Sequence, residues 1–370
     1  MTTADFQRDA EIVHDGFVTP HSATMAVDGK QEVAGCVYHA DGRKSAQSER
    51  YSGHEGDRVR TTNPDRMTPP KDARRVPGRG VYLGHFMGGY YGHFITETLS
   101  TLWIFEEQPA AEFDYFLFHP FTSGRKMTDA ARYCFERFGM DPARIIFADE
   151  RPLQVEELVV PERLLRLNHS ADVRLRSVYE RITADVRGSA PPTERVYLSR
   201  RSLNRTKFER VTANEVRIER LFDRRGFSIV YPERLAFAEQ LRLYSNAATI
   251  AGSSGSSLHN SIFARPGTEV IELGDPRYGG RRAPTQVLCD QVSGVQNTLI
   301  PFAGRRFGPK RTMLFSTKAI EAGLDSALTP VEAPPPAADL SWLKDAPEVI
   351  YRSLRPTAGH IARQVTGILR

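Results

Sequence analysis

Residues 244–273 place the strictest limit on the fold, because they contain four different local patterns in a short space. The apolar run 248–251 predicts a buried strand, and a loop of glycine and serine follows it. Apolar side chains between residues 258 and 263 then recur at helical spacing, and residues 268–273 predict another strand. A strand, a loop, a helix and a strand in this order form the repeating unit of an α/β fold with a parallel sheet.

The loop in this unit is a candidate phosphate site. It brings Gly255, Ser256 and Ser257 to the start of the predicted helix. Free backbone N–H groups and the positive end of the helix dipole meet at such a position, and both favour an anion. The alternative is an ordinary connection rich in serine and glycine, and the loop alone does not decide between the two.

Length and composition narrow the class of protein. A chain of 370 residues suits two domains, and 40% hydrophobic with 26% charged residues is ordinary for a soluble globular protein. No apolar run reaches the roughly eighteen residues of a membrane span, and the first residues lack the apolar core of a signal peptide. Cys36, Cys134 and Cys289 are far apart and odd in number, which is typical of reduced thiols in a cytosol. We therefore expect a cytoplasmic protein.

The charge of the chain indicates an anionic ligand without naming it. The formal net charge is +5, which fits a surface that meets phosphates or acidic lipids. The interleaved aromatic and basic residues of an RNA-binding sheet are not visible, so no nucleic-acid partner is expected.

The sequence patterns predict four parts. Gly188 and the paired prolines Pro191 and Pro192 lie in a linker at 187–193, because they end a helical pattern. The predicted parts are an irregular, polar N-terminal extension (1–78) with scattered strand-like pieces such as 32–39, an α/β domain (79–190), a second α/β domain (194–328), and a Pro-rich linker with a helical tail (329–370).

Both predicted domains alternate strand and helix patterns, which indicates parallel sheets covered by helices. In the first domain the predicted strands are 81–83, 115–118, 144–147 and 157–160, and the predicted helices are 93–107, 128–138 and 171–186. In the second domain, before the unit at 244–273, the predicted strands are 196–199 and 227–231 and the predicted helices are 214–225 and 235–246.

The C-terminal tail has two interpretations. Between residues 340 and 370, apolar side chains alternate with Arg352, Arg355, Arg363 and Arg370. The first interpretation is a helix that docks on the body of the protein. The second is an amphipathic basic segment that makes peripheral contact with an anionic membrane surface.

Several familiar sites are excluded by their spacing. Residues 252–256 place serine where a nucleophile elbow needs its second glycine, and neither a Walker loop nor a dinucleotide fingerprint follows a strand. The chain also lacks Asp-x-Asp, the usual carboxylate pair that holds a divalent metal on a nucleotide diphosphate. This pattern predicts a diphosphate held by arginines and backbone N–H groups, with no metal.

A cluster of arginines follows the predicted strand 196–199. Arg200, Arg201 and Arg205 enter a predicted loop, where their guanidinium groups can fork onto phosphate oxygens. Ligands of open α/β sheets bind at the carboxyl ends of strands, which favours this role. The alternative is a solvated basic loop.

Four blocks in order resemble glycosyltransferase family 61, including its bacterial members linked to capsular polysaccharide synthesis. The resemblance covers about residues 80–300. The family usually has Gly-x-His-Gly-Ala in the loop, and this chain has Ser254 in place of that histidine. The blocks are Gly92-His93-Phe94-Ile95-Thr96-Glu97; Tyr197-Leu198-Ser199-Arg200 with Arg205; Asn214-Glu215 with Gly226-Phe227 and 232–240; and 247–260 with 266–273.

The resemblance implies two Rossmann-like domains that face each other across a cleft, the arrangement called GT-B. It implies an inverting, metal-independent transfer of a sugar from a nucleotide-sugar donor, expected to be UDP-linked, to a hydroxyl of a glycan or lipid-linked glycan acceptor. No further cofactor is implied. An inverting transfer needs a base for the acceptor proton. His93 is the candidate base, and Glu97, one helical turn later, would orient it, bind acceptor hydroxyls or itself be the base. The alternative is that His93 caps the helix and Glu97 pairs with a nearby arginine.

The same resemblance assigns roles in the second domain. Arg200 and Arg205 would stabilise the leaving diphosphate, together with the backbone N–H groups of the loop at 255–257. Asn260 and Glu272 would contact the nucleoside.

Other functions remain open at this point. One is a non-catalytic nucleotide-sugar-binding or regulatory subunit of a polysaccharide assembly complex. Another is an enzyme that modifies nucleotide sugars, such as an epimerase, but the missing dinucleotide fingerprint argues against it.

Overall fold

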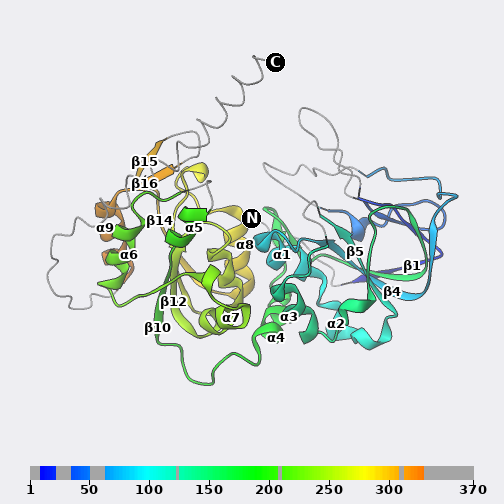
Figure 1. The fold of residues 1–370 in the computed structure, drawn as a ribbon, viewed down its shortest axis with the longest axis horizontal. Helices are drawn as coiled ribbons and strands as arrows, with labels where there is room; N and C mark the ends of the chain where they lie inside the picture. The colour runs from blue at the N-terminus through cyan, green and yellow to red at the C-terminus, as the bar shows by residue number, and fades with distance from the viewer. Residues whose placement is uncertain are drawn as a thin grey trace, which may run out of the picture. The chain divides into compact units, whose positions relative to one another are not determined.

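The chain divides into two compact units in a computed structural model (Figure 1). Unit 1 comprises residues 1–187 with 287–293, and unit 2 comprises residues 188–286 with 294–370. The division after Arg187 coincides with the start of the predicted linker, while the predicted four-part organisation stays a prediction. The structure describes residues 9–21, 35–50, 63–121, 125–206, 211–307 and 312–328.

Unit 1 is built on a mixed sheet that runs in the order β3-β2-β7-β4-β5-β6, with β1 also paired to β7. The neighbouring strands β4, β5, β6 and β7 are parallel, whereas β1 and β2 run antiparallel to β7. The strands are β1 (Ala10–His14), β2 (Phe17–Val18), β3 (Val37–Tyr38), β4 (Arg74–Phe86), β5 (Tyr115–Pro120), β6 (Ile145–Phe147) and β7 (Leu153–Pro161); β8 (Leu165–Arg166) and β9 (Ser170–Ala171) form a separate pair.

The N-terminal stretch differs from the predicted irregular extension over 1–78. Its described residues supply β1, β2 and β3, and β4 begins at Arg74, inside the stretch expected to be a loop. Val13, Val18 and Val37 are fully buried in one core with residues of β4, β5 and β7. Short strands of this kind carry a weak periodic signal, and the apolar side chains that they add to the core stabilise them.

The helix expected over 93–107 is broken into three pieces: α1 (Tyr91–Thr96), η2 (Thr98–Thr101) and α2 (Ile104–Glu107). Thr98 Oγ1 donates to the carbonyl of His85, and Thr101 Oγ1 donates to the carbonyl of Leu83. These bonds fix the segment against β4, and hydroxyl side chains that bind backbone in this way compete with regular helix.

The other helices of unit 1 begin close to the predicted positions. The helix α3 (Asp129–Arg137) has a capping residue, Thr128, whose hydroxyl oxygen accepts from the N–H of Ala131. The helix predicted over 171–186 divides into η5 (Val173–Leu175) and α4 (Arg176–Thr183). Short 3-10 turns η1 (Ala46–Ser48), η3 (Ala110–Glu112) and η4 (Pro142–Arg144) complete the unit.

Unit 2 is built on a parallel sheet in the order β11-β10-β12-β13-β14. Numbered within the unit, this order is 2-1-3-4-5, which is one of the common orders of an open, doubly wound α/β sheet. The strands are β10 (Glu194–Leu198), β11 (Ser228–Val230), β12 (Ala247–Ser253), β13 (Glu269–Leu273) and β14 (Gln296–Ile300); β15 (Gly304–Phe307) and β16 (Thr312–Phe315) form a separate antiparallel pair.

Helices α6 and α9 share one core with β10, β12, β13 and β14, which places them on the same face of that sheet. The stacked rings of Tyr197 and Phe222, with centroids 4.3 Å apart, lie in this core. The helices of the unit are α5 (Arg201–Thr206), α6 (Glu215–Asp223), α7 (Phe237–Asn246) and α9 (Thr317–Ala327), with 3-10 turns η6 (Pro232–Arg234), η7 (Leu258–Phe263) and η8 (Pro276–Tyr278). The helix α8 (Pro284–Ser293) begins in unit 2, and its residues 287–293 belong to unit 1.

Two local predictions in unit 2 need correction. The arginine cluster at 201–205 lies in the helix α5, where a loop was expected. The helix expected after the Gly/Ser loop is the 3-10 helix η7, which has six residues. Its dipole is therefore smaller than that of a long α-helix.

The predicted α/β class is confirmed. Within the described part of the chain, no helix is both long and apolar enough to cross a membrane. The linker and tail at 329–370 lie outside the described residues.

Candidate active site

His93 and Glu97 contact each other on the first helix of unit 1. Nδ1 of His93 lies 2.5 Å from Oε1 of Glu97. The spacing of four residues predicts this contact, because side chains one turn apart share a helix face. The His93 side chain is 43% exposed, whereas that of Glu97 is 3% exposed, so the imidazole is accessible from solvent and its partner is not.

Arg50 forms an ion pair with the other side of the Glu97 carboxylate. Nε of Arg50 donates to Oε2 of Glu97 at 2.9 Å, and the terminal nitrogen Nη2 donates to Oε1 at 3.3 Å. The Arg50 side chain is 5% exposed, and its guanidinium carbon lies 4.8 Å from the centroid of the Phe121 ring. The three side chains form a series, Arg50–Glu97–His93, in which the buried carboxylate is held from both sides.

The electrostatics of this series keep Glu97 ionised. Burial alone would raise the pKa of Glu97, but the charge of Arg50 and the hydrogen bonds from His93 and Arg50 outweigh it and lower the pKa to about 2. An ionised carboxylate only accepts hydrogen bonds, so Nδ1 of His93 donates to it, and in the neutral imidazole with this tautomer the lone pair is on Nε2. The arrangement leaves Nε2 as the basic atom.

A second buried polar group lies at the carboxyl ends of β4 and β7. His85 of β4 accepts at Nδ1 from Nη2 of Arg163, which follows β7, at 3.0 Å. Arg163 is 6% exposed and its Nε makes no hydrogen bond to a described residue. The strand order changes direction between β4 and β7, and open α/β sheets bind their ligands at such a position.

Arg200 is buried at the carboxyl end of β10. It is 8% exposed, and its Nε atom has no hydrogen-bond partner among the described residues. Its backbone N–H donates to Oε1 of Glu215 at 2.9 Å, which also accepts from the hydroxyl of Tyr197 at 2.9 Å. Burial raises the pKa of Glu215, although these two hydrogen bonds oppose the rise.

A second carboxylate on α6 fixes the same strand end. Oε1 of Glu219 accepts from Ser199 Oγ at 2.6 Å and from Tyr231 Oη at 3.0 Å. Glu215 and Glu219 are one turn apart, so α6 presents both carboxylates to the end of β10. The backbone beside Arg200 is thus held in place without using the Arg200 side chain.

The Gly/Ser loop lies beside Arg200, because β10 and β12 are neighbours and Leu198 pairs with Gly252. Gly255 has φ +142°, a conformation that glycine adopts readily and other residues rarely do. Ser256 and Ser257 are half-buried. The structure therefore brings Arg200 and the predicted phosphate loop together at the point where the order 2-1-3 changes direction.

The two residues expected to contact a nucleoside support the loop. Glu272 is fully buried in β13, and its Oε1 accepts from Ser254 Oγ at 2.5 Å. Asn260 is 1% exposed, and its amide donates to the carbonyl of Ser257 at 3.0 Å. Ser254, which stands where the family has histidine, is thus a partner of Glu272.

Sequence reasoning missed Arg50, Arg163 and Glu219 as parts of these groups, and it named Glu215 within a family block without giving it this role. Arg50 is 47 residues from Glu97, and no local pattern connects two residues so far apart. The helix spacing of Glu215 and Glu219 was a usable signal for a shared face. The side chain of Arg205 lies outside the described part of the structure, and no group of three metal-ligating side chains gathers among the described residues.

Residues 91–271 match the model of a family described as Glycosyltransferase 61. The match begins at the first residue of α1 and ends in β13, so it includes His93, Glu97 and Arg200, whereas Arg50 lies before it. No curated protein matches the chain. Over these residues, which are just under half of the chain, the match supports glycosyltransferase family 61.

Proposed function

We propose that the protein is an inverting, metal-independent glycosyltransferase that moves a sugar from a nucleotide donor, UDP-linked, to a hydroxyl of a glycan or lipid-linked glycan. The observation that carries the proposal is the series Arg50–Glu97–His93, because it presents an accessible imidazole whose Nδ1 is held by a buried, ionised carboxylate. Such an imidazole is suited to remove a hydroxyl proton.

The acceptor half of the reaction belongs to unit 1. Nε2 of His93 takes the proton of the acceptor hydroxyl while its oxygen attacks the anomeric carbon of the sugar. Glu97 stabilises the imidazolium that forms, as a buried carboxylate does for a catalytic histidine in other enzymes. The low pKa of Glu97 makes it a poor base itself, which favours His93 as the base.

The donor half belongs to unit 2. The bond between the anomeric carbon and the diphosphate oxygen breaks as the new bond forms on the opposite face, so the configuration inverts. Arg200, Arg205 and the backbone N–H groups of residues 255–257 stabilise the negative charge of the leaving diphosphate. The buried position of Arg200 supports this role, because a charge with an unpartnered Nε is strongly stabilised by an anion.

The two units would act together as the two Rossmann-like domains of a GT-B enzyme. We place the enzyme in bacterial surface or capsular polysaccharide synthesis, in the cytoplasm and at the inner face of the membrane through the tail at 329–370. Asn260 and Glu272 support the donor loop in this scheme.

The test is a nucleotide-release assay with a panel of nucleotide sugars and glycan acceptors, with and without a chelator. We expect nucleotide to be released from one nucleotide sugar of the panel, and we expect this release to persist when a chelator removes divalent metal ions. His93→Ala should abolish most of it, whereas His14→Ala, a change at a histidine of the same unit whose side chain is 66% exposed, should not. Binding of a nucleotide sugar without release by any acceptor would indicate a non-catalytic binder instead.

A further inference from the structure

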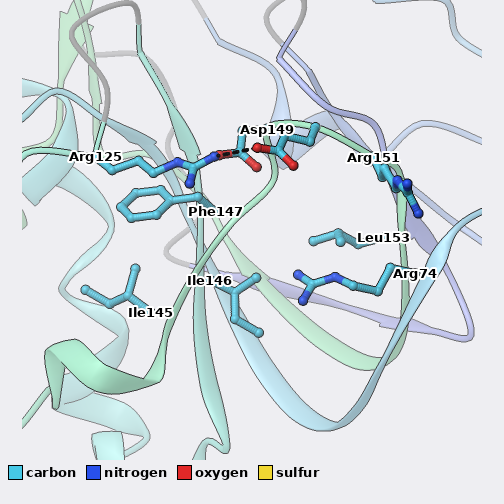
Figure 2. Close-up of a pocket in the computed structure, with 9 residues that line it drawn as sticks. Arg74, Arg125, Ile145, Ile146, Phe147, Asp149, Arg151 and Leu153 are labelled. Carbon is cyan, nitrogen blue, oxygen red and sulfur yellow. Dashed lines mark hydrogen bonds and ion pairs between the residues drawn. The ribbon is translucent and has the colours of Figure 1, made fainter.

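A pocket of about 510 Å³ lies in unit 1 between the edge strand β6 and the starting residues of β4 and β7. Its size falls in the range of small-molecule sites. Ile145, Ile146 and Phe147 of β6 line it from one side, and Leu153 of β7 lines it from the other. Figure 2 shows Leu153 between Arg151 and Arg74, with the Arg74 side chain extending toward Ile146. The pocket therefore has an apolar lining beneath a charged rim.

The charges of the rim are of two kinds. Arg125 forms ion pairs with Asp149 and, at 3.5 Å, with Glu150, so its charge is compensated within the pocket wall. Arg74 and Arg151 also line the pocket, and neither side chain makes an ion pair or hydrogen bond to a described residue. Two uncompensated guanidinium groups beside an apolar surface match a ligand that has an anionic group on an apolar body.

The pocket residue Arg125 is the neighbour in the chain of Lys126, which contacts the turn that precedes His93. The carbonyl oxygen of Lys126 approaches Gly88 so closely that it would lie 2.5 Å from a Cβ atom at that position. The ring of Phe121, before Arg125 in the chain, lies 5.6 Å from the ring of Tyr90, which in turn lies 6.3 Å from that of His93. Phe121 and Lys126 thus lie near the turn leading into α1, and Arg125 lines the pocket.

We propose that this pocket binds a phosphate-bearing amphiphile as the lipid-linked part of the acceptor. The role of this ligand as an acceptor rests on the proposed function, whereas its binding to the pocket does not. A small hydrated anion would leave the half-buried Ile145 and Phe147 in contact with water, and a neutral apolar molecule would leave the two exposed arginines without an anionic partner. An alkyl or isoprenyl phosphate satisfies both parts of the pocket, because its phosphate accepts from Arg74 and Arg151 while its chain covers the apolar lining.

The test is equilibrium binding to the full chain without any sugar donor, so that it is independent of turnover. The probes are dodecyl phosphate below its micelle concentration, inorganic phosphate, and the neutral dodecyl maltoside. We expect dodecyl phosphate to bind one to one and much more tightly than either control. The double change Arg74→Gln with Arg151→Gln should weaken it by at least ~10-fold, the usual order for lost charge-assisted hydrogen bonds. Arg132→Gln, at an exposed arginine of α3 that does not line the pocket, should have no effect.

Loss of this selectivity, or of its dependence on the two arginines, overturns the inference. Equal binding of inorganic phosphate would show a simple anion site, and equal binding of the maltoside would show a simple apolar groove. Absent binding, or binding unchanged in a folded double variant, would remove this pocket as the site. If the protein transfers sugar to a lipid-free glycan but does not bind the alkyl phosphate, the proposed function is retained and only the pocket is rejected. Binding of the alkyl phosphate without any sugar transfer would support the pocket as a binding site and reject the proposed function.

Discussion

Arg50 and Glu97 form an ion pair in which Nε lies 2.9 Å from Oε2, and both side chains are almost completely buried. Glu97 in turn holds Nδ1 of His93. The carboxylate therefore links a residue of the N-terminal stretch to the accessible imidazole on α1. Because buried charges cost free energy unless they are paired, each member of this group depends on the others.

The first prediction concerns the identity of the base. His93→Ala should lower the rate of transfer by roughly 10²–10⁴, the usual contribution of a general base, because no other group would take the proton. Donor affinity should stay unchanged, because the proposed phosphate contacts belong to unit 2. Turnover kinetics and calorimetric titration of the nucleotide would measure the two quantities. A larger loss of rate in Glu97→Gln than in His93→Ala would make Glu97 the base.

The second prediction concerns stability in acid. The folded protein lowers the pKa of Glu97 from 4.5 to about 2. A group with a lowered folded pKa contributes stability that is present above its unfolded pKa and is lost as pH falls through the folded one. The free energy of unfolding should thus fall between about pH 4.5 and 2, and Glu97→Gln should remove part of this dependence. Urea unfolding at several pH values would show it, and an unchanged slope in the variant would contradict it.

The third prediction concerns Arg50. Arg50→Met should destabilise the protein by about 3–5 kcal/mol, because it leaves the buried Glu97 carboxylate without its cation. The double change Arg50→Met with Glu97→Gln should recover part of this loss. Denaturant unfolding of the four proteins gives the coupling between the two residues. Strictly additive losses would mean that the ion pair does not couple them.

The fourth prediction concerns the donor site. Arg200→Ala should weaken binding of a nucleoside diphosphate by roughly 10- to 100-fold, because it removes a buried charged hydrogen bond. Arg205→Ala should have an effect of the same order. Arg195→Ala, at the opposite end of β10, serves as the matched control and should bind normally. Calorimetry with and without a chelator measures all three, and affinity that vanishes on chelation would contradict metal-independent binding.

The fifth prediction concerns the C-terminal tail. If residues 329–370 contact an anionic membrane, the full chain should co-sediment with acidic liposomes more than a version that ends at Leu328. Raising the salt concentration should reduce the difference, because salt screens the attraction. If the two versions partition equally, the tail does not contact the membrane, and the interpretation as a helix that docks on the body of the protein is favoured.

Local sequence determined those features whose physical cause is local. The apolar run and Gly/Ser loop in 244–273 predict β12, its turn and β13 because strand and turn propensities act over a few residues. The contact between His93 and Glu97 follows from helix geometry alone. Thr128 caps α3 by the same kind of short-range bond.

Tertiary structure alone decided the features that join distant segments. Nothing near Arg50 in the sequence indicates its pairing with Glu97, because that ion pair forms only when the N-terminal strands add to the sheet beside β7. The strand order 2-1-3-4-5, which brings Arg200 beside the Gly/Ser loop, and the pocket between β6 and β7 arise in the same way. Hydrogen bonds and burial between distant residues are properties of the packed chain, and single-sequence patterns do not encode which partners meet.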